Sequence, residues 1–147
     1  MDVDGNDIGP TGEAGITVIE TGTAPAMVTG NTIHQATGAG VIVLDATATV
    51  MNNTISATAY NPADAFGDGV AFGMNADVTV QGNTITGSAR NGVVFLDGAS
   101  GTIDGNEATG NGEYGILEFC TGAPNAVLIG DNVLDNNTLG PTNLCSP

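Results

Sequence analysis

A short motif centred on asparagine recurs along the whole chain and limits the folds that the chain can adopt. Gly-Asn-Thr-Ile stands at residues 30–33 and 82–85, and close variants occur elsewhere. Successive asparagines are separated by 22 to 30 residues. A β-branched aliphatic residue precedes each asparagine by three positions, and a small or aliphatic residue follows it by two. The aligned asparagines are Asn6, Asn31, Asn53, Asn83, Asn106 and Asn132.

Glycines mark a second fixed position in the repeat. Gly15, Gly40, Gly92 and Gly115 each stand nine residues after one of the asparagines, at the start of an apolar run. The third copy reaches its glycine, Gly69, only after sixteen residues. We therefore expect an insertion loop at residues 59–67.

Repeats of this length are not pairs of helices, because no window shows an apolar stripe with a period of 3.6 residues. Short β-branched runs bounded by Gly, Asn or Asp predict an all-β solenoid of about six coils, whose parallel strands stack about 4.8 Å apart. An asparagine at the same corner of every coil tolerates left-handed backbone, and its amide can bond the amides above and below. The six asparagines are thus expected to form a ladder.

This pattern resembles the right-handed parallel β-helix repeats of the pectate-lyase-like superfamily. The strand that begins at Gly92 and the preceding Val80-Gln81-Gly82-Asn83-Thr84-Ile85 show the type. The resemblance implies a single β-helix domain over residues 1–147, with a C-terminal cap at residues 136–147. Because Val3 already stands in mid-repeat, the C-terminal part of a longer solenoid is the other interpretation. The architecture carries many activities and specifies none.

The resemblance also bears on the two cysteines, whose spacing alone leaves a disulfide and two free thiols open. Cys120 lies five residues after Gly115, and Cys145 lies five after Gly140, which is taken as the glycine of the last coil. Equivalent positions in neighbouring coils lie about 5 Å apart, within disulfide range. The resemblance therefore implies a Cys120–Cys145 disulfide, and with it a secreted or cell-surface protein.

Charge excludes two classes of partner. The chain has 16 acidic residues, no lysine and one arginine, for a formal net charge of −15. Nucleic acid is excluded because few cations are available to displace counterions from phosphate. An anionic membrane surface is disfavoured for the same reason, and no apolar run is long enough for membrane insertion.

Few side chains are candidates for catalysis. From the resemblance, a uronate-cleaving lyase would need clustered basic side chains, but Arg90 and His34 fall at different corners of different coils. Arg90 is expected at the surface near Asp68. A glycosidase needs two carboxylates roughly 5 to 9.5 Å apart, and Glu20 and Asp45 occupy one column of adjacent coils at a plausible separation.

A calcium site is the one cofactor hypothesis. Asp2, Asp4 and Asp7, with Glu13 beyond, have spacing like that of an oxygen-ligand loop. The loop has Asp7 where an EF-hand needs glycine, and a strand follows it, so these residues equally fit an acidic first coil without metal. The main expectation is that no cofactor is bound.

The apolar strand after each glycine suggests a contact surface. Side chains alternate between faces, so if Val41, Val43, Val93 and Phe95 face the core, the other set forms an aliphatic sheet face. We expect this face to bind a second copy or a neighbouring domain, unless the Tyr60–Phe66 loop covers it. Its members are Ile19, Ile42, Leu44, Val94, Leu96, Leu117 and Phe119.

Threonines form outward columns on another sheet, as on ice-binding solenoids, but other residues interrupt them. The columns are Thr32, Thr54, Thr84 and Thr49, Thr79, Thr102.

The favoured interpretation is a non-catalytic secreted or cell-surface β-helix module with a structural, adhesive or self-associating role. The first alternative is a polysaccharide-acting glycoside hydrolase or lyase of the pectate-lyase-like superfamily. The second is an ice- or calcium-binding solenoid.

Overall fold

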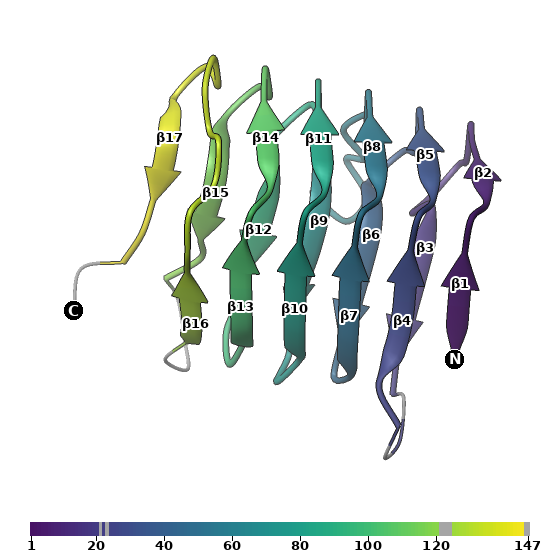
Figure 1. Cartoon of the computed structure of the whole chain (residues 1–147). Helices are drawn as coiled ribbons and strands as arrows, with labels where there is room; N and C mark the ends of the chain where they lie inside the picture. Colours follow the sequence, from purple (N-terminus) through teal and green to yellow (C-terminus); the bar gives the residue numbers. More distant parts are fainter. Residues whose placement is uncertain (21, 23, 121–124, 146–147) are drawn as a thin grey trace.

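Parallel β-strands wind the chain into a solenoid. The structure is a computed structural model that describes residues 1–20, 22, 24–120 and 125–145. Within these residues the regular structure is entirely β, and each coil visits three sheets in turn. In Figure 1 the coils stand side by side, with strands of the first two sheets in front and those of the third behind. The predicted all-β parallel solenoid is confirmed.

The first and third sheets have six strands each, and the second has five. The first contains β1 (Asp2–Asp4), β4 (Ala26–Thr29), β7 (Thr47–Met51), β10 (Asp77–Gln81), β13 (Ser100–Asp104) and β16 (Ala126–Ile129). The second contains β2 (Asp7–Ile8), β5 (Thr32–His34), β8 (Thr54–Ser56), β11 (Thr84–Thr86) and β14 (Glu107–Thr109). The third contains β3 (Ile16–Ile19), β6 (Ala39–Leu44), β9 (Asp68–Gly73), β12 (Val93–Phe95), β15 (Tyr114–Glu118) and β17 (Gly140–Asn143). No helix in the described ranges could cross a membrane.

The core fills the inside of the solenoid with vertical files of like side chains. Val28, Val50 and Val80 stack on successive strands of the first sheet, and all three are fully buried. In the third sheet Phe72 stacks on Phe95 with ring centroids 5.9 Å apart. Because alternate side chains of each strand point inward, the repeat seen in the sequence becomes one continuous core.

Close approach between coils explains the glycines at the start of the third-sheet strands. A Cβ built on Gly40 would lie 2.6 Å from the carbonyl oxygen of Gly69, and one on Gly69 would lie 2.7 Å from that of Gly92. Real side chains do not tolerate such distances. The glycine column is therefore required by backbone packing.

The asparagine ladder is present and uninterrupted. Nδ2 of Asn53 donates to Oδ1 of Asn83 at 2.9 Å, and the backbone N–H of Asn53 donates to the same oxygen at 2.9 Å. Nδ2 of Asn53 also donates to the carbonyl oxygen of Val28. Both amide-to-Oδ1 hydrogen bonds recur between each consecutive pair from Asn6 to Asn132.

The predicted reason for asparagine at this corner is only half right. The left-handed residue is the one before the ladder asparagine: Gly30, Asn52 and Gly82 have φ of 64°, 55° and 63°. The ladder residues themselves are not left-handed. Asparagine is required there for its amide, and the preceding glycine supplies the conformational freedom.

The last coil carries the predicted disulfide. Cys120 and Cys145 are joined, with Cα atoms 5.8 Å apart. The expected glycine register is wrong by one residue, since Tyr114 pairs with Gly140 and the backbone opposite Gly115 is Pro141. Glu118 lies beside Phe95 in the register, and its two carboxylate oxygens accept hydrogen bonds from Asn125 Nδ2 and from the backbone N–H of Cys145.

Candidate functional site

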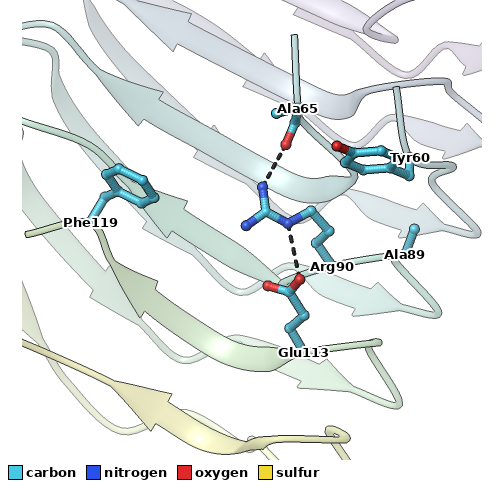
Figure 2. A pocket seen from close by; sticks show the side chains of 6 residues that line it. All are labelled: Tyr60, Ala65, Ala89, Arg90, Glu113 and Phe119. Atoms are coloured by element: carbon cyan, nitrogen blue, oxygen red, sulfur yellow. Dashed lines mark hydrogen bonds and ion pairs between the residues drawn. The ribbon is translucent and has the colours of Figure 1, made fainter. Parts of the chain in front are cut away.

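The seven-residue insertion of the third copy builds a depression beside the third sheet. Residues 57–67 join β8 to β9. The loop is closed by hydrogen bonds from Asn61 N to Phe66 O at 2.7 Å and from Ala65 N to Asn61 O at 2.9 Å. Figure 2 shows the resulting depression, whose volume is about 580 Å³. It is lined by Tyr60, Ala65, Ala89, Arg90, Glu113 and Phe119.

A single ion pair lies in this depression. Arg90 Nε donates to Glu113 Oε1 at 3.2 Å, and Arg90 Nη1 donates to the carbonyl oxygen of Ala65. Partial burial disfavours the charged guanidinium, but the hydrogen bond to Glu113 and the nearby Asp68 outweigh it and raise the pKa of Arg90. Arg90 lies near Asp68, as expected, since the two charges act on each other. Its ion-pair partner is Glu113, because Arg90 and Glu113 occupy the same column of adjacent coils, 23 residues apart.

Two aromatic side chains lie at separate places around this pair. Tyr60 comes from the insertion loop and is 50% exposed, while Phe119 follows β15 and is 43% exposed. Figure 2 shows both rings at the depression, with the Arg90 guanidinium between them. The depression thus offers apolar ring surface and a neutralised polar pair to solvent.

Asp68 is a fully buried carboxylate at the start of β9, next to the insertion. Its Oδ1 accepts hydrogen bonds from Asn91 Nδ2 at 2.8 Å and Asn91 N at 3.0 Å, and its Oδ2 accepts one from Gly67 N. Burial raises the pKa of the Asp68 carboxyl above its ordinary value, although these hydrogen bonds and the charge of Arg90 lower it. Asp68 therefore anchors the end of the insertion loop to the next coil.

The predicted carboxylate pair lies elsewhere. Glu20 and Asp45 directly follow the paired residues Ile19 and Leu44, so they are neighbours in the column after the third-sheet strands. Both are exposed, and both have left-handed backbone, with φ of 49° and 48°. Neither lines the depression, which lies mainly among residues that precede these strands.

The predicted calcium ligands are not brought together. Asp2 and Asp4 lie on β1, whereas Asp7 lies on β2 in the next sheet. Asp4 Oδ1 accepts a hydrogen bond from Thr29 Oγ1 at 2.7 Å, and Asp7 lies 3.3 Å from His34 Nε2. Within the described ranges no three acidic, histidine or cysteine side chains form a group that could hold a metal.

The predicted aliphatic face is not an open surface. Ile42, Val94 and Leu117 retain 9%, 4% and 8% of their exposure, so the expectation of a flat exposed patch is wrong at its centre. They form a second, outer cluster, against which Phe66 of the insertion loop and Tyr114 pack. Leu44 and Leu96 are half-buried at its border. Ile19 and Phe119 remain exposed.

The threonine columns are where the sequence places them. Thr32, Thr54 and Thr84 pair in register on the second sheet, and Glu107 continues their column. The column of Thr49, Thr79 and Thr102 lies on the first sheet, with Met27 at one end and Leu128 at the other. A further hydroxyl column of Ser56, Thr86 and Thr109 escaped the sequence interpretation.

Several site residues were not predicted, although the register could have found them. Arg90 and Glu113 each stand seven residues after a ladder asparagine, so their contact follows from the repeat. Asn111 and Asn137 each stand five residues after one, and Asn111 Nδ2 donates to Asn137 Oδ1 at 2.9 Å. The insertion-loop contacts of Tyr60 and Ala65 carry no repeat signal.

Comparison with protein families decides the assignment of the fold. The family model for the right-handed β-helix region matches residues 1–144. The chain belongs to the right-handed β-helix family. No curated protein matches the sequence.

Solved structures agree on the fold. The crystal structure of the periplasmic alginate epimerase AlgG matches with a TM-score of 0.81 and 18% sequence identity. Two mutant forms of AlgG match with TM-scores of 0.81 and 19% identity. The match covers 99% of this chain and 37% of AlgG, so the chain spans little more than a third of its structural relative. At this identity the likeness concerns the fold. A disulfide and a β-helix of this type are compatible with an extracytoplasmic location.

Proposed function

We propose that this chain is a non-catalytic, extracytoplasmic β-helix module that adheres to neutral polysaccharide through the depression beside the insertion loop. Its family and its structural similarity to an alginate epimerase support a polysaccharide-related role. The disulfide supports an oxidising compartment. The observation that carries the proposal is the placement of Tyr60 and Phe119 around the Arg90–Glu113 pair.

The chemistry of the depression suits a sugar. An exposed aromatic ring offers an apolar face to the C–H side of a pyranose, while its edge and neighbours remain polar. Arg90 has N–H groups and Glu113 has carboxylate oxygens, which complement hydroxyl acceptors and donors. Ala65 and Ala89 contribute only small side chains to the lining of the depression.

Charge argues for a neutral rather than an anionic polymer. Arg90 is the only arginine or lysine of the chain, and Glu113 already neutralises it. The formal net charge of −15 would repel a polyuronate at low ionic strength. Epimerase or lyase chemistry on a uronate is disfavoured for the same reason, because nothing in the depression is free to neutralise the substrate carboxylate.

Affinity electrophoresis through gels that contain neutral or acidic polysaccharides tests the proposal. We expect retardation by at least one neutral polymer, and a loss of about tenfold in affinity in both Tyr60→Ala and Phe119→Ala. Ile19→Ala is the matched control, since Ile19 is an exposed apolar residue outside the depression. Equal retardation of all four proteins, or no retardation on any polymer, would contradict the proposal.

An enzyme remains the alternative, and turnover distinguishes it. Reducing-sugar and double-bond assays on the same panel are expected to show no product. Product formation that Asp45→Asn abolishes would assign catalysis to the Glu20 and Asp45 column instead.

A further inference from the structure

Two Asn-Asn-Thr triplets, at residues 52–54 and 136–138, match the acceptor sequence for N-linked glycosylation. In that sequence, Asn-x-Ser or Asn-x-Thr with x other than proline, the first asparagine receives the glycan. No other asparagine of the chain has serine or threonine two positions later. A motif this short also occurs by chance, so its place in the structure decides whether it is a usable acceptor.

Both triplets lie at corners of the solenoid and divide an outward amide from an inward one. Asn52 and Asn136 are exposed and have left-handed backbone, with φ of 55° and 58°. The second asparagine of each triplet forms hydrogen bonds between coils. Asn53 is a rung of the buried ladder, and Asn137 accepts two hydrogen bonds from Asn111. A group attached to the first asparagine would therefore leave these inter-coil hydrogen bonds intact.

The corner at Asn52 leaves room around its side chain. Gly30 and Gly82 occupy the same position in the preceding and following coils, so no side chain stands on either side of Asn52 in this column. A Cβ built on Gly82 would lie 2.6 Å from Oδ1 of Asn52, which places the amide over the bare backbone of that glycine. Asn52 is thus open to solvent although coils pack on both sides of it.

The corner at Asn136 is exposed in interior coils as well. Its equivalents, each four residues after a ladder asparagine, include Ala57, Gly87 and Gly110. These three are exposed, with φ between 54° and 67°. Further coils follow each of them, so exposure is a property of this corner and not only of the last coil.

We propose that Asn52 and Asn136 are acceptors of N-linked glycans. Nδ2 of the asparagine attacks C1 of an oligosaccharide carried on a lipid diphosphate. The N–C1 bond forms, the C1–O bond to the diphosphate breaks, and the amide nitrogen loses one proton. The proposal rests on the extracytoplasmic location in the proposed function, because N-linked glycans belong to secreted chains. Neither asparagine lines the depression, so the glycans leave it accessible.

Tolerance of left-handed backbone is the competing explanation for these two asparagines. Asparagine adopts that conformation more readily than most residues do. Glycine meets the same requirement with less strain, as at Gly30 and Gly82 in the column of Asn52. If conformation alone accounts for Asn52 and Asn136, neither amide carries a glycan, and the two explanations predict different masses for the protein.

Glycopeptide mass spectrometry of the protein purified from its native source tests the proposal. We expect a glycan on Asn52 and on Asn136, and on no other asparagine. An unmodified amide at both residues would overturn the proposal. A glycan on a ladder asparagine such as Asn53 would also overturn it, because that amide is buried.

Variants of the full chain, secreted by cells that glycosylate Asn-x-Thr, identify the acceptors. Asn52→Gly and Asn136→Gly introduce the residue that neighbouring coils already have at these corners, so both should fold. Each should lose one glycan, and the double variant should lose both, measured as the mass that peptide N-glycosidase removes. Thr54→Ala should match Asn52→Gly, whereas the conservative Thr54→Ser should keep its glycan. Unchanged glycan mass in Asn52→Gly would contradict the assignment of Asn52.

Gly30→Asn is the converse experiment. It gives the preceding coil the same Asn-Asn-Thr sequence, at a corner where a Cβ lies 3.3 Å from Oδ1 of Asp4 and 3.8 Å from the backbone N of Gly5. We expect one additional glycan, since the corner is exposed. A folded Gly30→Asn protein without it would overturn the argument from the corner.

The disulfide, measured in the same samples, keeps this proposal separate from the proposed function. A chain secreted with the Cys120–Cys145 disulfide but without glycan would overturn the glycosylation and leave the extracytoplasmic location standing. Polysaccharide binding is measured on protein without glycans, so it does not depend on this outcome. Circular dichroism confirms that each variant is folded.

Discussion

Two corners of the same coil hold their buried polar groups in different ways. Between the first and second sheets every coil supplies an asparagine, and each amide acts as donor and acceptor in one unbroken chain. At the next corner, five residues later, asparagine occurs only in the last two coils. The column there is Thr11, Ala36, Thr58, Ser88, Asn111 and Asn137.

The mixed corner shows what an interruption does. Ser88 N donates to Asn111 Oδ1, as an asparagine in the ladder would, but Ser88 Oγ is buried without a hydrogen-bond partner. An amide has its donor and its acceptor on two separate atoms and can reach both neighbouring coils, whereas a serine hydroxyl has both on one oxygen with a shorter reach. A continuous ladder therefore gives more stability per residue than isolated pairs.

Removing a central rung of the ladder should have the largest effect. Asn83→Ala removes the Oδ1 that accepts from both the backbone N–H and Nδ2 of buried Asn53, and Nδ2 keeps only its hydrogen bond to Val28. We expect a loss of about 3 to 5 kcal/mol in the free energy of unfolding, measured with urea. Gln81→Ala, at an exposed position of the neighbouring strand, is the control and should change it by less than about 0.5 kcal/mol. Equal losses of unfolding free energy in Asn83→Ala and Gln81→Ala would contradict the stabilising role of the ladder.

The same substitution at the mixed corner should cost less. Asn111→Ala removes the acceptor of Ser88 N and the hydrogen bond to Asn137, which is only half-buried in the last coil, although Asn111 itself is buried. We expect about 1 to 3 kcal/mol in the same urea experiment. A loss larger than that of Asn83→Ala would show that continuity of the ladder is not what stabilises it.

Asp68 and Asn91 form a third file of buried polar groups, with only these two members. Its contribution to stability should depend on pH. Burial raises the pKa of the folded Asp68 carboxyl, so the folded state holds its proton more tightly than the unfolded chain. The free energy of unfolding should fall as the pH rises from about 4 through the pKa of Asp68 in the folded state. At higher pH it should stay at this lower value. Asp68→Asn should lack this decline, whereas Asp77→Asn, an exposed acid, should retain it. Identical pH profiles in the two variants would contradict the assignment.

Ser88→Ala should have the smallest effect and the opposite sign. The substitution removes a buried hydroxyl that has no partner and keeps the backbone N–H that Asn111 accepts. We expect an increase in the free energy of unfolding of up to about 1 kcal/mol. A clear destabilisation in thermal unfolding would mean that the hydroxyl has an unrecognised role.

Sequence reasoning succeeds where one residue type repeats in register. The ladder, the glycine column and the fold follow from such repetition, since each coil needs the same hydrogen bond or the same close approach. The disulfide was also predicted, although the register used for it was displaced by one residue at Gly140. A covalent pair tolerates this displacement because both Cα positions remain within disulfide range.

The candidate site could be predicted only in part. Contacts between adjacent coils, such as Arg90 with Glu113, are implied by the register, but the path of the insertion loop is not. Phe66 lies on that loop and packs against the outer aliphatic cluster. The centre of the face that was expected to be an interface is therefore buried within the chain. Loops that break the repeat also remove the information that the repeat carries.

Hydrogen exchange of the asparagine amides tests the ladder most directly. Backbone N–H groups of Asn31, Asn53, Asn83 and Asn106 all donate to Oδ1 of the following coil. We predict that all four exchange slowly, with the side-chain amides of the same residues, and at rates close to global unfolding. Exposed Asn52 and Asn136 provide rapidly exchanging side-chain references. Fast exchange at any two of the four central residues would show that the asparagines do not form one continuous file.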